Sequence, residues 1–510
     1  MEKRTIIAIA MSFLVIFGWS ALVSRLRPPE NTALRSVSLP KPSQPSIAPS
    51  PATSLPAAVP EEAPETPATT FIFPQDKGEP VFIEQLAIIK HTVFKKYQNY
   101  DFSLKSGFLL TDKNLLFKRQ NSSSDTALFV HRDKDKQVIK RFIFHNSNYT
   151  IDLYIEVQNL STKEIEFNPG IILGILDFSG DQVETRFKDI TVVTSDKTIH
   201  NGAKKDAIFE NIRFLGLRDH YFCNIIQPKS PGYSAFVRKI NAQESEIGLS
   251  AKAITIQTGK TSVQEFRIYL GPQELKLINQ INPEYTAVLY FGTFDFISHI
   301  LIQILDWLYG IAHNWGWAII LFSICISLLL YPLSLQQMRS MKQMQVLQPK
   351  IEELRKIYKD NPQKLNKEMM DLYRIHKVNP LGGCLPLILQ IPVFFALYQA
   401  MIRSISLKGA HFLWINDLSQ PDRLFSFSAI GPIKEINLLP ILMTAIMFIQ
   451  QKLSMTAVSA TANEQQKIMT IIMPVMFLFI FYNMPAGLVL YWLVNSSIML
   501  FNQFKINRLK

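Results

Sequence analysis

The side chains that could act on a substrate lie within apolar runs of the C-terminal half and carry no charge. Ser323 and Ser327 stand four residues apart in one run, Gln390 lies in a second and Asn495 in the last. Asp, Glu, Lys, Arg and His are missing from the interior of these runs, although ion-coupled transporters usually keep such residues there. The pattern therefore favours either hydrogen bonds that hold helices together or a wet, uncharged cavity for polar peptide groups.

No constellation of catalytic or metal-binding residues stands out elsewhere. The histidines of the N-terminal half show no metal-ligand spacing: His91, His131, His145, His200 and His220. Three cysteines are too few for a disulfide framework, and no glycine-rich phosphate loop accompanies the net charge of +12. The sequence therefore indicates no cofactor, no metal and no sequence-specific nucleic-acid partner.

Membrane spans must position the polar residues, because about twenty apolar residues cross a hydrocarbon core of about 30 Å. The apolar runs predict an α-helical polytopic membrane protein with six transmembrane helices, five of which form a core. They are 1–24, 315–335, 381–403, 436–452, 468–484 and 485–504. We interpret 1–24 as an uncleaved signal anchor; the alternative is a cleavable signal peptide, for which Arg25-Leu-Arg-Pro-Pro is a poor cleavage context.

A polar region separates the first span from the others. Residues 25–70 are rich in Pro, Ser and Ala and predict a disordered tether. Residues 71–290 contain short runs of alternating apolar and polar residues, such as YTIDLYIEVQN, and predict a large antiparallel β-sandwich. Residues 291–314 predict an amphipathic helix in the membrane interface, ended by Asn314-Trp-Gly-Trp.

The charge distribution predicts the orientation. Residues 336–380 read as a helical hairpin with ten Lys and Arg against five carboxylates, so the positive-inside rule places it in the cytoplasm. Both termini, the loop 453–467 and the basic tail 505–510 then lie inside, while the sandwich and the loop 404–435 lie outside. Four hairpin methionines either contact varied apolar substrates or hold the hairpin together: Met338, Met341, Met344 and Met369.

Seven segments resemble the YidC/Oxa family of membrane protein insertases, over about residues 290–505. They are Tyr331-Pro-Leu, Met344–Glu353, Lys377-Val-Asn-Pro-Leu-Gly-Gly-Cys-Leu-Pro, Gln390-Ile-Pro-Val-Phe, Trp414-Ile-Asn-Asp-Leu-Ser, Gln465-Gln-Lys-Ile-Met and Pro485-Ala-Gly-Leu-Val-Leu-Tyr-Trp. The signal anchor and the external domain resemble the Gram-negative bacterial form. That domain is similar to the family's sandwich related to sugar mutarotases, for which no sugar chemistry is expected.

The resemblance implies an insertase and chaperone of the bacterial inner membrane rather than an enzyme. Its core spans would enclose a hydrophilic groove through which polar segments of nascent membrane proteins pass while their hydrophobic helices enter the bilayer. Carried over by position, the groove residues are Ser323, Ser327, Gln390, Tyr491, Trp492 and Asn495. The implied partners are nascent membrane proteins, the ribosome, the general secretory translocon with its accessory proteins, and the lipid bilayer; the implied state is a monomer.

One residue departs from the family pattern. The family usually has an arginine four residues before the Tyr-Pro of the first core span, and here that position is Ser327. The groove would then rely on neutral hydrogen-bonding groups rather than on a positive charge.

Three other functions remain open at this point. A transporter or channel with an external solute-binding domain requires a polar path through the membrane. A membrane-anchored carbohydrate-active enzyme requires a catalytic cluster in the sandwich. A passive assembly scaffold requires only that the hairpin binds partners.

Overall fold

The computed structural model describes residues 69–508 with short gaps at 113–114, 121–122, 181, 202, 204, 293, 360, 377, 379–384, 431–432 and 456–463. The described residues all belong to one unit, Leu55–Lys510. The predicted signal anchor and nearly all of the predicted tether lie outside them.

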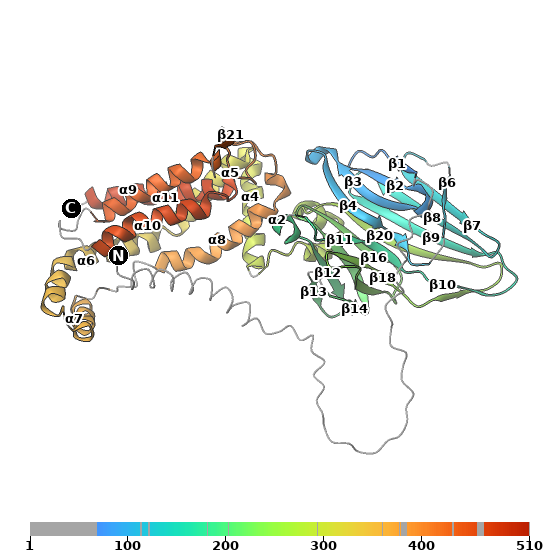
Figure 1. Ribbon diagram of the computed structural model, residues 1–510, viewed down its shortest axis with the longest axis horizontal. Coiled ribbons are helices and arrows are strands. Elements are labelled where there is room, and N and C mark those ends of the chain that lie inside the picture. The colour runs from blue at the N-terminus through green and yellow to red at the C-terminus, as the bar shows by residue number, and fades with distance from the viewer. Residues whose placement is uncertain are drawn as a thin grey trace, which may run out of the picture. The chain divides into compact units, whose positions relative to one another are not determined.

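A nine-stranded sheet forms the largest layer of the N-terminal part (Figure 1). Its strands are, in spatial order, β13 (Thr198–Asn201), β12 (Asp189–Thr194), β15 (Ile212–Arg218), β16 (Phe222–Pro228), β20 (Thr261–Pro272), β9 (Thr150–Asn159), β8 (Lys136–His145), β7 (Thr126–Arg132) and β6 (Lys118–Arg119). Successive side chains of a strand point to opposite faces of its sheet. In β8 every second side chain is buried and so marks the inward face: Val138, Lys140, Phe142 and Phe144.

Smaller sheets complete this part. One holds β14 (Ala207–Phe209), β17 (Ser234–Lys239), β18 (Glu244–Ser250), β11 (Ile171–Asp177) and β5 (Leu109–Leu110); another holds β1 (Thr70–Ile72), β2 (Glu79–Ile83), β3 (Ile88–Phe94) and β4 (Tyr100–Gly107); β10 (Ile165–Phe167) pairs with β19 (Ile254–Ile256). Every strand pairing among the described residues is antiparallel. One hydrophobic cluster joins the sheets, which confirms the predicted antiparallel β domain.

Short helices connect or follow these strands. They are η1 (Glu84–Leu86), η2 (Lys95–Tyr97), α2 (Gln182–Thr185), α3 (Leu275–Ile281) and η3 (Pro283–Val288). Asn282 begins η3, since its side chain accepts a hydrogen bond from the Glu284 N–H.

The helical part begins with two helices that meet at a sharp bend. The chain bends by 120° between α4 (Asp295–Ala312) and α5 (Trp315–Leu329). The Asn314 side chain accepts hydrogen bonds from the N–H groups of Gly316 and Trp317 and so caps α5. The chain therefore changes direction at the Asn314-Trp-Gly-Trp segment that the sequence marks as a break.

A break between two helices lies inside the span predicted for 315–335. α5 stops at Leu329, and a new helix, α6 (Tyr331–Ile357), starts with Pro332 in its first turn. Proline has no N–H to donate to the Leu328 carbonyl, and its ring disfavours a continuous helix there. α7 (Pro362–Ile375) follows, capped by Asn361, so two successive helices occupy most of the range 336–380 for which the hairpin was predicted.

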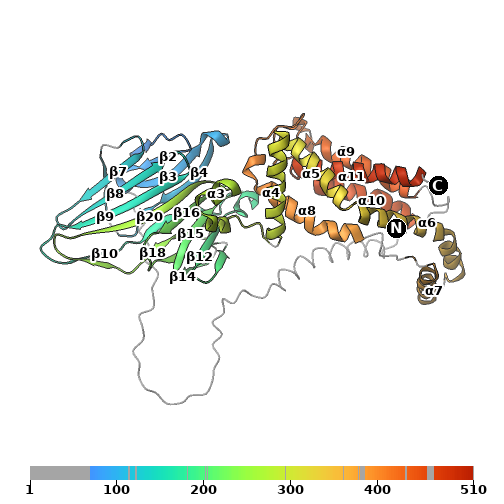
Figure 2. The same ribbon diagram turned by 180° about the vertical axis from the view of Figure 1, so that it is seen from behind.

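Four further helices form a bundle with α5. They are α8 (Leu385–Arg403), α9 (Leu438–Met455), α10 (Glu464–Phe481) and α11 (Ala486–Arg508). α11 packs against both α5 and α9, and α9 against α10 (Figures 1 and 2). The loop between α8 and α9 holds η5 (Ile405–Leu407) and a small hairpin, β21 (Phe425–Ile430) with β22 (Ile433–Ile436), which the sequence did not predict.

Length and apolarity alone identify no individual membrane-crossing helix among the described residues. The bent pair α4–α5 is long and apolar enough only when its two helices are taken together. Shorter apolar helices cover Leu438–Leu453 and Ile471–Phe481.

Candidate functional site

Two hydrogen bonds between neutral side chains connect α11 to its neighbours. Ser327 Oγ on α5 donates to Asn495 Oδ1 at 2.9 Å, and Gln390 Nε2 on α8 donates to the Tyr491 hydroxyl at 2.6 Å. Tyr491 and Asn495 are four residues apart and therefore share one face of α11. We call these four residues the polar seam.

The polar seam is the only place where the candidate groove residues form hydrogen bonds between helices in the described part of the chain. Tyr491 is fully buried, with its ring 5.9 Å from that of Phe322, so its hydroxyl needs a partner. Interhelical hydrogen bonds of this kind contribute only about 0.6 kcal/mol on average. Such weak bonds hold the helices in register, and other polar groups can replace them.

Ser323 and Trp492 are placed differently from the other candidates. Ser323 is fully buried and donates to the Ile319 carbonyl of its own helix at 2.7 Å, so it joins no second helix by a hydrogen bond. The half-buried Trp492 packs against aromatic rings of α8 and α10, with Phe394 at 5.4 Å and Phe481 at 5.2 Å. Both residues are close in sequence to members of the polar seam, but they pack against neighbouring groups and form no hydrogen bond of the seam.

The loop after α8 covers the N-termini of α9 and α11. The Leu418 and Gln420 carbonyls accept hydrogen bonds from the first N–H groups of α11, at 2.9 and 2.7 Å. Asp422 Oδ2 accepts from the Leu439 N–H at 2.9 Å, at the start of α9. Backbone donors at helix N-termini have no partner within the helix. The loop supplies those partners and fixes the two helix ends to one another.

The same loop also covers α5. A Cβ added at Gly316 would lie 2.0 Å from Phe412 Cγ, so only glycine allows this contact. Sequence reasoning missed the role of the loop, and its only signal was the Trp414-Ile-Asn-Asp-Leu-Ser motif.

The hairpin methionines divide into two groups. Met344 and Met369 pack against a small core of Leu347, Ile351 and Val378, so they hold the hairpin together. Met338 is half-buried on α6, and the side chain of Met341 lies outside the described residues.

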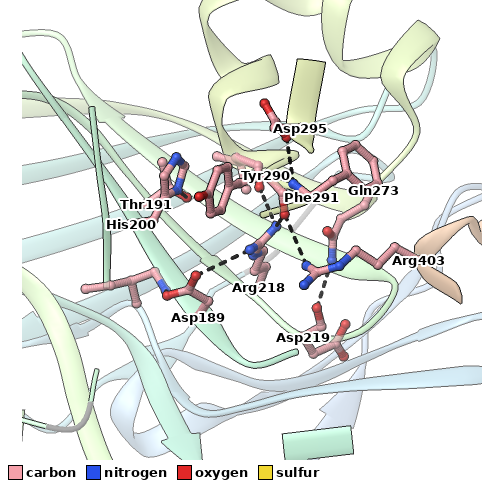
Figure 3. Close-up of polar contacts among 12 residues, drawn as sticks. Asp189, Thr191, His200, Arg218, Asp219, Gln273, Tyr290, Phe291, Asp295 and Arg403 are labelled. Atoms are coloured by element: carbon pink, nitrogen blue, oxygen red, sulfur yellow. Dashed lines mark hydrogen bonds and ion pairs between the residues drawn. The ribbon is translucent and has the colours of Figure 1, made fainter. Parts of the chain in front are cut away.

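A cluster of arginines joins the β domain to α8 (Figure 3). Arg218, at the end of β15, is buried and donates to the Tyr290 carbonyl at 3.0 Å and to Asp189 Oδ2 at 3.3 Å. Arg403, at the end of α8, donates to the same Tyr290 carbonyl at 3.2 Å. Two guanidinium groups from different parts of the chain therefore share one acceptor.

His220 makes a second connection to α8. Its Nε2 donates to the Ile402 carbonyl at 2.7 Å, and its ring stacks on Phe187 and Tyr221 at 3.9 Å each. Burial lowers the pKa of His220 to about 4, so the imidazole is neutral at pH 7. Sequence spacing gave no signal for this role. Within the described ranges, no three His, Cys, Asp or Glu side chains are placed to hold a metal ion.

Two family models match the chain, one over the β domain and one over the helical part. The family described as "60Kd inner membrane protein" matches residues 307–510, and "YidC periplasmic domain" matches residues 95–304. The fold and the two matches define the class: an inner membrane protein with a periplasmic domain rich in antiparallel sheet.

Relatives that match most or all of the chain narrow the class to one family. A protein of Syntrophobacter fumaroxidans named "Membrane protein insertase YidC" is 36% identical over 73% of this chain and 68% of its own length. One of Geotalea daltonii with the same name is 30% identical over 100% of this chain and 99% of its own. The chain belongs to the YidC family.

A crystal structure of an active YidC insertase, with its first transmembrane domain resolved, is 21% identical. It covers 85% of this chain and 92% of its own, with a TM-score of 0.42. None of these similarities supports the transporter or channel alternative.

Proposed function

We propose that this chain is a membrane protein insertase and chaperone, and that the polar seam receives polar segments of nascent membrane proteins. The observation that carries the proposal is the pair of interhelical hydrogen bonds, Ser327 to Asn495 and Gln390 to Tyr491. The names of the relatives support the same function.

Exchange of hydrogen bonds gives the seam its role. A peptide group without a partner costs about 2–7 kcal/mol in an apolar environment. The seam offers hydroxyl and amide groups that act as both donors and acceptors, and they are paired with one another when no substrate is present. A passing polar segment exchanges partners with them, so no group is left unpaired at any stage.

Charge plays little part in this mechanism. Ser327 occupies the position where the family usually has arginine, and it pairs with the neutral Asn495. We therefore propose that substrate polarity is handled by hydrogen bonding and local thinning of the bilayer. Ser327→Arg should change the insertion of acidic-tailed substrates little; a sharp improvement would show that charge had been limiting.

Site-directed photo-crosslinking with variants tests the seam. A crosslinker at position 327 or 390 should capture a nascent single-span protein during insertion. Ser327→Ala combined with Gln390→Ala should reduce insertion about tenfold, since two bonds of about 0.6–1.7 kcal/mol are lost. The matched control is Ser323→Ala with Ser497→Ala, because both serines donate within their own helices.

The outcomes separate an insertase from a scaffold. The control should insert near the wild-type level. If the seam variant inserts as well as the wild type, the seam assignment is wrong. If no crosslinks form while the protein still supports assembly, the chain acts as a passive scaffold.

We also propose six spans with both termini in the cytoplasm, the ribosome and the translocon as partners, and a monomeric state without enzymatic activity. The basic hairpin and the basic tail support this orientation. A crosslinker at the half-buried Met338 of α6 extends the same series: capture of nascent chains there, before capture at position 327, is expected of a cytoplasmic receiving hairpin.

A further inference from the structure

A polar cavity of about 440 Å³ lies between the β domain and the first turns of α4. Strands β13 and β15 contribute His200 and Arg213, η3 contributes Glu284, and α4 contributes Asp295 and His299. Figure 3 shows His200 stacked on Tyr290, with Asp295 on the neighbouring helix. The volume lies within the range of about 300–1,000 Å³ that small-molecule sites occupy.

The charged side chains that line the cavity favour a ligand that carries both a cationic and an anionic group. The lining holds two carboxylates, Asp295 and Glu284, and one guanidinium, Arg213, which pairs with Glu284. His299 Nε2 lies 3.6 Å from Asp295 Oδ1. His200 adds no charge, because burial and the nearby Arg218 lower its pKa to about 4. The carboxylates suit an ammonium group, while the single guanidinium suits one phosphate.

The surface beside the cavity is apolar. Phe296, Ile300, Trp307 and Ile311 of α4 are 77, 41, 65 and 56% exposed, whereas Leu301, Leu305 and Leu308 face the bundle. Each residue turns a helix by about 100°. Asp295 and His299 therefore lie only about 60–100° around α4 from Phe296. A polar cavity and an exposed apolar stripe thus meet on one helix.

We propose that this cavity binds the headgroup of an aminophospholipid, with the primary ammonium at Asp295 and the phosphate at Arg213. The acyl chains lie along the stripe of Phe296, Ile300 and Trp307. The stripe distinguishes a lipid from a soluble ligand, because only an amphiphile fills both surfaces. The inference rests on the proposed position of α4 in the membrane interface.

Lipid competition on the full-length chain in mild detergent tests the site. Native mass spectrometry would follow binding of dioleoyl phosphatidylethanolamine, phosphatidylcholine and phosphatidylglycerol at equal concentrations. The ethanolamine lipid should be retained about fivefold over the choline lipid, since a quaternary ammonium cannot donate hydrogen bonds to Asp295. The anionic lipid should bind no better than the choline lipid.

Two variants test whether the preference for the ethanolamine lipid arises in the cavity. Asp295 Oδ1 accepts a hydrogen bond from the Phe291 N–H at 2.7 Å, and Asp295→Asn keeps that acceptor while it removes the charge. The variant should lose the fivefold preference. The matched control is Asp306→Asn, which makes the same change three turns further along α4, away from the cavity lining.

The proposal would be overturned by a preference for the anionic lipid, by an ethanolamine preference that survives Asp295→Asn, or by an equal loss in Asp306→Asn. Soluble glycerophosphoethanolamine should compete poorly; if it binds as tightly as the lipid, the stripe is irrelevant and the ligand is no lipid. Insertion activity is a separate readout, because its loss with lipid preference intact would concern the polar seam alone.

Discussion

Replacing Lys140 by methionine would test how the β domain tolerates a buried amine. Lys140 is fully buried in β8, and its Nζ donates to the Ala87 carbonyl at 2.7 Å and to the Phe108 carbonyl. No carboxylate forms an ion pair with it among the described residues. Burial lowers its pKa from 10.5 to about 7, so folding favours the neutral amine.

The size of the effect follows from proton linkage. Between pH 7 and pH 10.5 the unfolded chain binds more protons at Lys140 than the folded chain does, so stability rises with pH in this window. Each pKa unit is worth about 1.4 kcal/mol. Raising the pH from 7 to 9.5 should therefore stabilise the wild type by about 3 kcal/mol relative to Lys140→Met, which has no group to titrate there.

The free energies of unfolding of the wild type and of Lys140→Met should converge or cross as the pH falls. Methionine leaves the carbonyls of Ala87 and Phe108 without their donor, which costs about 1–3 kcal/mol for each group. At pH 9.5 this loss makes the variant clearly less stable. Near pH 6 the wild type carries the full penalty of a buried ammonium, and the difference narrows or reverses.

Pulsed thiol labelling of Cys223 provides the assay. Cys223 is fully buried in the core that also contains Phe142 of β8, and the chain has only three cysteines. With Cys325 and Cys384 replaced by serine, labelling in increasing urea reports opening of the β domain in the full-length protein. Lys90→Met on the exposed side of β3 is the control. An unchanged difference between wild type and Lys140→Met from pH 7 to 9.5 would refute the reasoning.

Two further perturbations concern the connection of α8 and the packing of α5. Acidification from pH 6.5 to pH 4 should destabilise the packing of the buried His220 ring against α8, because a histidine whose folded pKa is about 4 binds fewer protons folded than unfolded in this window. Hydrogen exchange at η5 should then rise several-fold in the wild type but not in His220→Gln, and equal rises in both would exclude His220 as the cause. Gly316→Ala should lower stability by about 1–3 kcal/mol through its clash with the Phe412 ring. Thermal scans should show partial recovery when Phe412→Ala is added, and strictly additive losses would contradict the contact.

Several features of this chain could be predicted from local sequence because local physics decides them. Alternation along β9 predicted the antiparallel domain, and Asn314 with the two tryptophans that follow it marked the start of α5. The uncharged polar residues of the apolar runs pointed to α5, α8 and α11, whose side chains form the hydrogen bonds of the candidate site. Pro332 was visible as well, but its effect depends on whether the preceding turn continues, and the helix break at Leu330 inside the predicted span was not foreseen.

Tertiary structure alone decided which of these residues meet. Ser327 and Asn495 are 168 residues apart, and spacing within one helix cannot show which face meets another helix. Ser323 has the same chemistry as Ser327, yet it turns to its own backbone because its position on α5 faces the packed interior. In the same way, Lys140 sits at an inward position that the pattern marks, but only the carbonyls of Ala87 and Phe108, brought from two distant turns, let a buried amine remain there.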